Sequence, residues 1–332
     1  MVELVATTTG LYPLPDRAKE RLADLKGHQK EDLIDGTEGA EIGRVYDEAR
    51  KTVLDWQREA DLDLIVEGQC RWDDMLAHPL AVHDAVETRG IVRYYNNNNF
   101  YREPVVTGEL TPSGDVAAEL TAASEHVPSG LQAVLPGPYT LADLATDEHY
   151  DDDEEFLAAV TEFLATEIES FPDHDALFLL EPSLVTAPPE SGADERVSAA
   201  IDEVAAATDA DVVVHTYWGA LDERVHAHLL DARIDAVGYD LVNAHDEARA
   251  LVSEYGTADD VALGLVDARN TAVESPETIR ERVEWFQQGL PVQEFGAVYL
   301  LPNAETFYLP INRFRAKLAA LGEAATTTEV RA

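Results

Sequence analysis

Residues 212–217 read VVVHTY, a run of three valines that leads into His215 and Tyr217. β-Branched residues in series are typical of a strand that is buried on both faces. Side chains two residues apart on a strand point the same way, so His-X-Cys at the carboxyl end of a strand presents two ligands to zinc from a rigid base. Here the second position holds Tyr217. The stretch therefore predicts a buried strand that ends in a histidine but lacks the thiolate of such a zinc site.

Similar apolar runs recur along the whole chain, each followed by a loop with Gly, Pro or polar residues and then by a longer amphipathic stretch. Strands this apolar, alternating with helices, indicate a parallel sheet that is covered on both faces. Eight such units in about 320 residues fit a single closed (β/α)8 TIM barrel, spanning residues 1–324, better than two open sheets, which are the alternative. The predicted strands are 4–9, 62–67, 131–135, 176–180, 212–215, 236–240, 261–266 and 297–301. The predicted helices include 38–60, 153–170, 194–207, 222–232, 246–255 and 277–288.

One segment interrupts this alternation. Residues 91–110 read IVRYYNNNNFYREPVVTGEL and lie between the second and third units. Apolar and aromatic residues on both sides of an asparagine run are typical of a β-hairpin whose turn contains the asparagines. We therefore expect an inserted hairpin that folds over one end of the barrel and carries aromatic side chains and Arg102 to its mouth. Residues 325–332 are expected to form a flexible tail.

The chain is strongly acidic. It has 65 Asp and Glu residues against 24 Lys and Arg, a formal net charge of −41 and a pI of about 4.3, and its hydrophobic content of 45% is enough for a large core. Such a surface is typical of proteins adapted to concentrated salt, where self-repulsion is screened. The alternative is an acidic enzyme that works at ordinary salt concentrations. Nucleic acid and anionic membranes are poor partners for this surface.

The cysteine count and the hydropathy pattern indicate the cellular compartment of the protein. The single Cys70 excludes an intramolecular disulfide framework and a multi-cysteine metal cluster. The N-terminal residues show no basic region followed by a long apolar stretch, and no run in the chain approaches the length of a membrane span. We therefore expect a cytoplasmic protein.

In a barrel of this kind, catalytic residues gather at the carboxyl ends of the strands. The predicted strand ends here include Gly137 with Pro138, Glu181 and His215. Each also has a structural explanation, because Gly137 and Pro138 form a sharp turn and Glu181 can cap a loop or the next helix. A lone histidine is often a hydrogen-bonded structural residue. The residues alone leave both interpretations open.

Five short motifs follow one another at these strand ends and in the hairpin. In order they are Gly10-Leu11-Tyr12-Pro13, then residues 68–75 (GQCRWDDM), residues 99–104 (NFYREP), Gly137-Pro138-Tyr139-Thr140 and Leu180-Glu181-Pro182. In this order they resemble the turns of the cobalamin-independent methionine synthase family, and the resemblance covers nearly the whole chain. The hairpin motif is closer to the N-terminal barrel of that enzyme than to its catalytic barrel.

The resemblance implies a reaction and a metal. The family transfers a methyl group from methyltetrahydrofolate to the thiol of homocysteine, and its zinc lowers the pKa of that thiol. The four zinc-ligand positions fall on His215, Tyr217, Asp240 and Ala304, so both thiolates are replaced. With Glu305 beside the last position, the implied metal set is His215, Asp240 and Glu305, a harder ligand set than the family uses.

The resemblance also assigns positions to the substrates. The family's two amino-group ligands fall on Gln69 and Leu180, its carboxylate-binding serine on Leu11 and its pterin-backing tryptophan on Leu144. The hairpin is expected to face either a zinc-bearing homologue or the acidic folate tail, with Arg102 and Lys19 as the best-placed cations. The residues expected to contact homocysteine or the folate are Gly10, Gln69, Asp73, Glu181, Arg102 and Lys19.

Two functions follow from the resemblance, and both stay open. The chain is either a methyltransferase that uses the altered ligand set, or a catalytically degenerate partner that completes the substrate cleft of a zinc-bearing homologue. The family's own N-terminal barrel, a duplicated copy without zinc, is the precedent for the second. A third reading, decarboxylation of the uroporphyrinogen type, rests on fold alone. It needs an anion-binding cluster, for which the candidates are Arg17, Arg71, Arg93 and Arg102.

Overall fold

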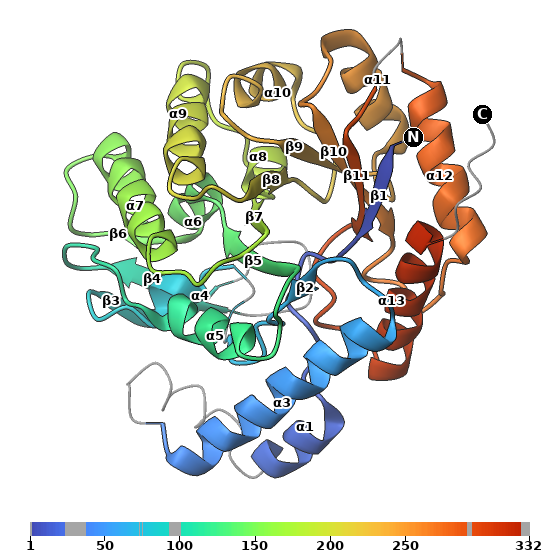
Figure 1. The fold of residues 1–332 in the computed structure, drawn as a ribbon. Coiled ribbons are helices and arrows are strands. Elements are labelled where there is room, and N and C mark those ends of the chain that lie inside the picture. Colours follow the sequence, from blue (N-terminus) through green and yellow to red (C-terminus); the bar gives the residue numbers. More distant parts are fainter. Residues whose placement is uncertain are drawn as a thin grey trace.

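The computed structural model describes residues 2–23, 38–72, 74, 76–92, 101–290 and 294–326. At its centre is a curled sheet of eight parallel strands (Figure 1), in the order β1-β11-β10-β9-β8-β7-β5-β2. Each of the eight predicted strands is present, although the first two are shorter than expected. The strands are β1 (Glu3–Ala6), β2 (Ile65–Val66), β5 (Leu131–Pro136), β7 (Ala176–Leu180), β8 (Asp211–His215), β9 (Ala236–Asp240), β10 (Asp260–Val266) and β11 (Ala297–Pro302).

The two end strands of this sheet, β1 and β2, approach each other. The backbone N–H groups of Asp63 and Leu64, just before β2, donate to the carbonyl oxygen of Ala6 at 3.0 and 3.3 Å. Beyond the strands, the N–H of Tyr12 donates to the carbonyl of Gly68 at 3.0 Å. A few hydrogen bonds thus join the ends of the sheet, whereas continuous ladders join every other pair of neighbouring strands except β2 and β5, which share two residue pairs.

Helices surround the sheet on its outer side (Figure 1). Several of them begin where the sequence supplies a capping side chain. The carboxylate of Asp152 accepts from the N–H groups of Glu154 and Glu155, and the hydroxyl of Ser275 accepts from Thr278. The longer helices are α1 (Asp16–Leu22), α3 (Ala40–Glu59), α5 (Asp115–Ser124), α6 (Pro138–Leu144), α7 (Asp153–Ile168), α9 (Asp194–Ala205), α10 (Glu223–Leu229), α11 (His245–Tyr255), α12 (Pro276–Gln288) and α13 (Ile311–Thr326). Single turns form α4 (His78–Ala81) and α8 (Ser183–Thr186).

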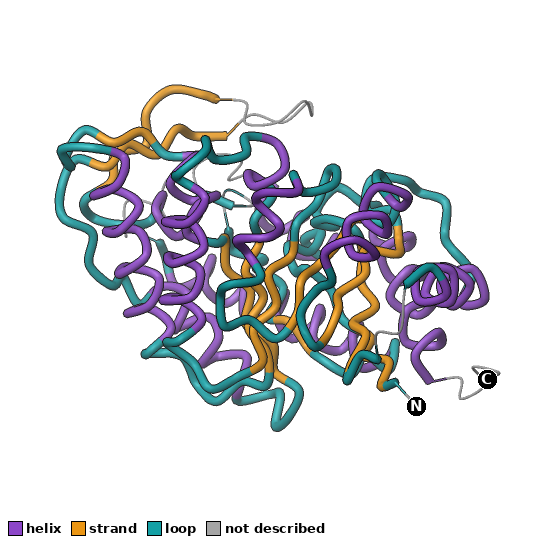
Figure 2. Tube along the Cα trace, turned by 90° about the horizontal axis from the view of Figure 1, so that it is seen from above, coloured by secondary structure: helices purple, strands orange, loops and turns teal. Residues whose placement is uncertain are grey.

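A small second sheet lies apart from the main one, at the edge of the molecule (Figure 2). Strands β3 (Val86–Val92) and β4 (Tyr101–Val106) pair antiparallel, and β6 (Thr146–Asp147) pairs with β4 in parallel. The paired segment begins five residues before the predicted start at residue 91, and its second strand ends at Val106. The predicted turn, with Arg93, Tyr94, Tyr95 and Phe100, lies outside the described residues.

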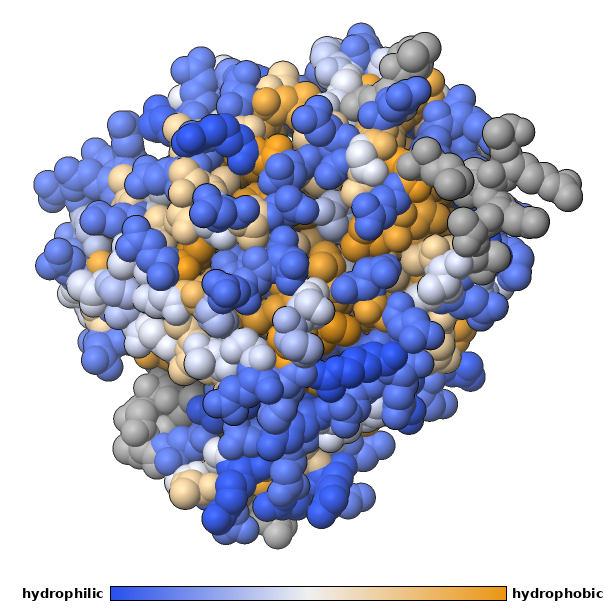
Figure 3. Space-filling model, viewed as in Figure 1, coloured by the Kyte–Doolittle hydropathy of each residue, from blue (hydrophilic) through white to orange (hydrophobic). Residues whose placement is uncertain are grey.

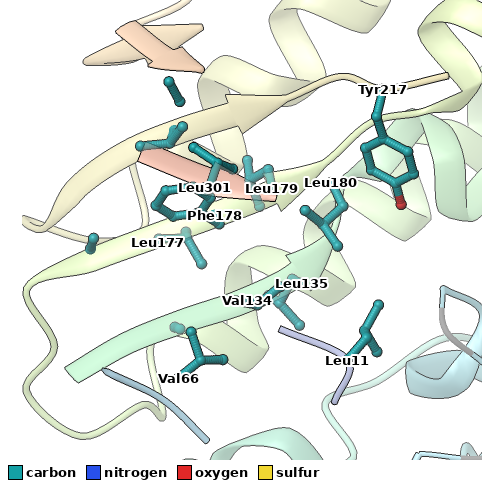
Figure 4. Packing of buried hydrophobic residues seen from close by; sticks show 14 of the residues in the cluster. Leu11, Val66, Val134, Leu135, Leu177, Phe178, Leu179, Leu180, Tyr217 and Leu301 are labelled. Carbon is teal, nitrogen blue, oxygen red and sulfur yellow. The ribbon is translucent and has the colours of Figure 1, made fainter. Parts of the chain in front are cut away.

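The core is built from strands whose side chains are buried on both faces. All five residues of β7 and all six of β5 are buried, which explains why these strands read as unbroken apolar runs. Figure 4 shows their side chains packed together with Leu301 of β11, while Leu11 and Tyr217 lie beyond the strand ends. On the outside, charged and polar residues cover most of the surface in view (Figure 3). Within the described ranges, no helix combines the length and apolar character needed to cross a bilayer.

Candidate functional site

Three strand ends of the main sheet meet in a buried polar cluster. His215 ends β8, Asp240 ends β9 and Asn303 directly follows β11. The Nε2 atom of His215 donates to the backbone carbonyl of Asn303 at 3.1 Å, and the Nδ2 atom of Asn303 lies 3.1 Å from both carboxylate oxygens of Asp240. Asn303 therefore links the two side chains, and we refer to the three residues as the His215–Asn303–Asp240 cluster.

Asp240 serves as an acceptor for the loops around it. Its Oδ2 accepts from the backbone N–H of Trp218 at 2.9 Å and from the side-chain amide of Asn243 at 2.6 Å. Its Oδ1 accepts from the N–H groups of Val242 and Asn243, both at 3.0 Å. With Asn303 added, both oxygens are surrounded by donors. This carboxylate holds the turns after β8 and β9 in place.

His215 is a neutral, fully buried imidazole. Burial lowers its pKa to about 4, and the hydrogen bond to Asn303 and the charge of Asp240 only partly oppose this shift. Because Nε2 carries the donated proton, Nδ1 has the free lone pair, and it has no hydrogen-bond partner among the described residues. A Cβ atom placed on Gly238 would lie 2.2 Å from Nδ1. That nitrogen therefore faces the backbone of β9 directly.

These residues do not fit a zinc ion. At the two positions where the resemblance expects thiolates, Tyr217 and Ala304 are fully buried. The oxygens of Asp240 are engaged by donors, and Nδ1 of His215 is covered by Gly238. Among the residues that the structure describes, no three His, Cys, Asp or Glu side chains are grouped as a metal site requires. Of the expected set His215, Asp240 and Glu305, the first two are instead joined by hydrogen bonds through Asn303.

Glu305 is different, because part of its carboxylate is not used by the scaffold. Its side chain is buried, and Oε2 has no hydrogen-bond partner within the described part of the chain. Burial raises its pKa to about 7, while a hydrogen bond to its own backbone and the charge of Arg269 lower it. The Arg269 guanidinium lies 4.8 Å from the ring centre of Trp218. Phe307 and Tyr308, both exposed and with ring centres 5.1 Å apart, follow in the same loop.

Glu181 anchors the start of helix α6. Its carboxylate accepts from the N–H groups of Tyr139 and Thr140 at 3.0 and 2.8 Å and from the Thr140 hydroxyl at 2.6 Å. Burial raises its pKa to about 7 in spite of these hydrogen bonds. Gly137 makes room for it, since a Cβ there would lie 2.2 Å from Oε1 of Glu181. Gly137 and Pro138 form the predicted turn, whereas Glu181 caps α6, a helix before it in the chain, instead of the next helix as predicted.

Gln69 links the first two strand-end turns. Its Oε1 accepts from the N–H of Leu11 at 2.8 Å, and a Cβ on Gly10, whose φ is +73°, would lie 2.3 Å from that oxygen. The N–H of Gln69 donates to Glu67 at 2.7 Å. Gly10 and Gln69 therefore contact each other in a closed turn. The next predicted residue, Asp73, lies outside the described residues.

The two cations expected near the folate tail do not lie at the strand ends of the main sheet. Lys19 is in α1, half exposed, with Asp16 at 3.7 Å. Arg102 is in β4, opposite Ile91. Arg71, a candidate anion ligand for decarboxylation, is in a buried ion-pair network and lies 2.8 Å from Glu38 and 3.1 Å from Glu119. Its guanidinium is therefore already neutralised by two carboxylates.

Sequence reasoning missed Asn303 and the pairing of Arg269 with Trp218. Both were visible as polar residues at strand ends, after β11 and β10 respectively. An asparagine beside a family ligand position is a signal for a hydrogen-bonded replacement, because its amide supplies both a donor and an acceptor.

An eight-stranded parallel α/β sheet, curled and with a buried polar cluster at its carboxyl edge, defines the class of barrel-type proteins that carry their sites at the strand ends. A family model described as "Cobalamin-independent synthase, Catalytic domain" matches residues 4–297. The chain belongs to the cobalamin-independent methionine synthase family.

Similar proteins carry consistent names. The methionine synthase of Sulfurisphaera tokodaii is 23% identical over 280 residues, which cover 83% of this chain and 79% of that protein. That of Saccharolobus solfataricus is 25% identical over 296 residues, covering 85% and 84%. A solved B12-independent methionine synthase from Shewanella sp. W3-18-1, in complex with selenomethionine, superposes with a TM-score of 0.78 at 18% identity over 98% of this chain and 97% of that one. A structure from Listeria monocytogenes, named as a putative vitamin-B12 independent methionine synthase, gives 0.71 at 18% identity and 98% coverage of both chains.

Proposed function

We propose that this chain takes part in methionine synthesis, in the transfer of a methyl group from methyltetrahydrofolate to the thiol of homocysteine. Family membership over residues 4–297 supports the reaction class, and the names of the similar proteins support the product. The residues proposed to contact the substrates remain Gly10, Gln69, Asp73, Glu181, Arg102 and Lys19. We place them on a single (β/α)8 barrel over residues 1–324, with the small sheet as its insertion. The hydrogen bonds that join β1 to the residues before β2 support a closed barrel.

Within this reaction, the geometry supports best a metal-free barrel that completes the substrate cleft of a zinc-bearing homologue. The observation that carries this role is the His215–Asn303–Asp240 cluster, whose mutual hydrogen bonds engage Nε2 of His215 and both carboxylate oxygens of Asp240, so two of the three expected zinc ligands are bound to Asn303. Activation of a thiol at neutral pH needs a group that stabilises the thiolate. We propose that the homologue supplies the zinc and that this chain supplies binding surface for the substrates.

The test uses the full chain in molar KCl, alone and mixed with a zinc-bearing homologue from the same host. The expected results are substoichiometric zinc in the isolated chain, no methyl transfer by it alone, and faster transfer by the homologue when the chain is added. Co-purification of the two from the host would support the pairing. Stoichiometric zinc together with full methyl transfer by the isolated chain would contradict it.

A second candidate function is methyl transfer by this chain itself, and Glu305 favours it. Its unpartnered Oε2 lies near the Arg269–Trp218 pair at the strand ends, where a buried carboxylate can accept the proton of a bound thiol. If the isolated chain transfers methyl groups, Glu305→Gln should abolish the activity while Glu294→Gln, an exposed carboxylate before β11, should not. Inactivity of the unmutated chain alone would remove this candidate.

A further inference from the structure

The positive charges of this molecule are concentrated on three neighbouring helices. Helices α1, α3 and α13 together contain 43 residues, with ten of the 24 Lys and Arg but only eight of the 65 Asp and Glu. The rest of the chain therefore has 57 acidic residues and 14 basic ones. The protein as a whole has a net charge of −41, whereas these three helices, taken by themselves, have a slight excess of basic residues.

The three helices form one continuous face, which we call the α1–α3–α13 face. They lie side by side in Figure 1, with α3 in contact with both others. Arg21 of α1 pairs with Glu48 of α3 at 2.7 Å, and Arg315 of α13 pairs with Glu59 of α3 at 2.8 Å. Figure 3 shows the surface over α1 and α3 as an almost unbroken hydrophilic area. These contacts fix the charges relative to one another.

The exposed charges on this face are balanced in number and only partly paired. Arg17, Lys51 and Arg313 have no carboxylate partner among the described residues, although acidic residues outnumber basic ones almost threefold in the chain. The exposed cations are Arg17, Lys19, Arg21, Arg44, Lys51, Arg58, Arg313 and Arg315. The exposed acids are Asp16, Glu20, Glu41, Asp47, Glu48, Asp55, Glu59 and Glu323.

A hollow of about 290 Å³ lies on the same face, between α1 and α3. Its apolar lining includes Ala18, Val45 and Ala49, and Arg17 and Lys51 also line it. Its walls combine apolar and charged groups, and two of its cations, Arg17 and Lys51, have no carboxylate partner among the described residues, so a protruding side chain of another molecule can enter it. The face thus has a concave area as well as exposed charges.

We propose that the α1–α3–α13 face is the surface through which two copies of this chain associate around a two-fold axis. Two molecules of this charge repel each other wherever their acidic surfaces meet, and in the described part of the chain this face is an extended area where exposed cations and acids balance. Around a two-fold axis each patch meets itself, so a surface with equal numbers of exposed cations and acids can be complementary to its own copy.

The test measures the mass of the full chain in solution, by sedimentation equilibrium in 1 M and 3 M KCl. The unmutated chain should be a dimer. Arg17→Glu combined with Lys51→Glu should lower the association constant by at least about tenfold, because it places four acidic side chains in each dimer where four cations stood. The control, Arg196→Glu with Arg233→Glu, makes the same change of charge at exposed sites elsewhere and should change the constant much less.

A second pair of variants keeps the proposal falsifiable if one protein is unstable. Glu20→Lys with Glu41→Lys should also produce monomers, and mixing this variant with Arg17→Glu/Lys51→Glu should restore dimers of mixed composition. A monomeric unmutated chain at about 100 µM, well above the Kd of a specific dimer, would overturn the proposal. So would equal weakening by the control variants, or a mixture that remains monomeric.

Discussion

At the scale of single residues, the cluster at the strand ends shows how a side chain can replace a metal ion. The backbone carbonyl of Asn303 accepts from His215 and its side-chain amide nitrogen donates to the carboxylate of Asp240, so Asn303 connects β8, β9 and β11 much as a bound cation would. The difference is chemical. An amide neither lowers the pKa of a thiol nor leaves an open coordination position, and the cluster therefore supports structure more than catalysis.

The first prediction follows for His215. His215→Ala removes the donor to the Asn303 carbonyl and leaves a buried acceptor unpaired, so the free energy of unfolding should fall by about 1–3 kcal/mol. His245→Ala, at the exposed start of α11, is the matched control and should change it little. Urea unfolding in molar KCl measures both. Equal stability of the His215 variant and the unmutated chain would show that the imidazole is not structural.

A second residue-scale prediction concerns Glu305 and pH. Its pKa is about 7 in the folded chain and near 4.5 in the unfolded one, so the folded state binds more protons between these values. The contribution of the neutral carboxyl to stability is complete below about pH 4.5 and is lost as pH rises through 7. By this linkage the unmutated chain should lose up to about 3 kcal/mol relative to Glu305→Gln between pH 5 and 8. Parallel stability curves for the two proteins would contradict the buried, unpartnered carboxylate.

At the scale of elements, Glu181 shows how the end of one strand fixes the helix that follows the neighbouring strand. The carboxylate reaches from the end of β7 to the first N–H groups of α6, and the approach is close enough to require glycine at residue 137. An alanine Cβ would lie 2.2 Å from that carboxylate, and neither group can withdraw without losing hydrogen bonds. Strand β7, helix α6 and the turn between β5 and α6 therefore depend on one another.

The third prediction tests this corner. Gly137→Ala should lower the free energy of unfolding by about 2–4 kcal/mol through overpacking and lost hydrogen bonds. Gly39→Ala, at the N-cap of α3, is the control because no atom lies within 4 Å of the added Cβ and its φ of −75° is ordinary. Chemical denaturation of the two variants under the same salt decides the matter. A cost no larger than that of the control would mean that Glu181 is not held against the turn.

The sequence predicts the elements better than the contacts between them. All eight strands were predictable because side chains buried on both faces produce unbroken apolar runs, as in β5 and β7. The predicted start of the hairpin, residue 91, lies after the start of β3 at Val86. The reason is that Val86–Val92 contains Glu87 and Arg89, so this strand of an exposed sheet has no unbroken apolar run. For the site, the sequence predicts which residues stand at the strand ends but not which of them contact each other. The bond of Gln69 to Leu11 and the link from His215 through Asn303 to Asp240 join residues more than 50 positions apart in the chain.

At the scale of the whole molecule, charge dominates. A net charge of −41 on one folded chain produces repulsion that grows as the salt around it is diluted. The ion pairs of the surface offset little of it, since exposed pairs contribute at most about 1 kcal/mol each. Stability should therefore depend on the ionic strength of the solvent more than on any single contact.

The fourth prediction is that the fold loses cooperativity below roughly 0.5 M salt, where the Debye length exceeds about 4 Å and carboxylates on neighbouring helices repel one another. The thermal midpoint should rise continuously with KCl concentration over the molar range. Circular dichroism across a series of KCl concentrations measures it, and sucrose at matched osmolality controls for solute exclusion without screening. A midpoint that stays level from dilute buffer to molar KCl would show that the acidic surface is not an adaptation to salt.

The pairing of β1 with β11 also has a consequence for how the chain is made. These neighbours are separated by about 290 residues, so β1 must wait for β11 to be synthesised before it gains its ladder of hydrogen bonds. At the usual 5–20 residues per second, that delay is on the order of 15–60 seconds. Until then the nascent chain can assemble β5 to β10 in sequence, each beside its predecessor, while β1 lacks its neighbour β11. Completion of the sheet therefore waits for the synthesis of β11.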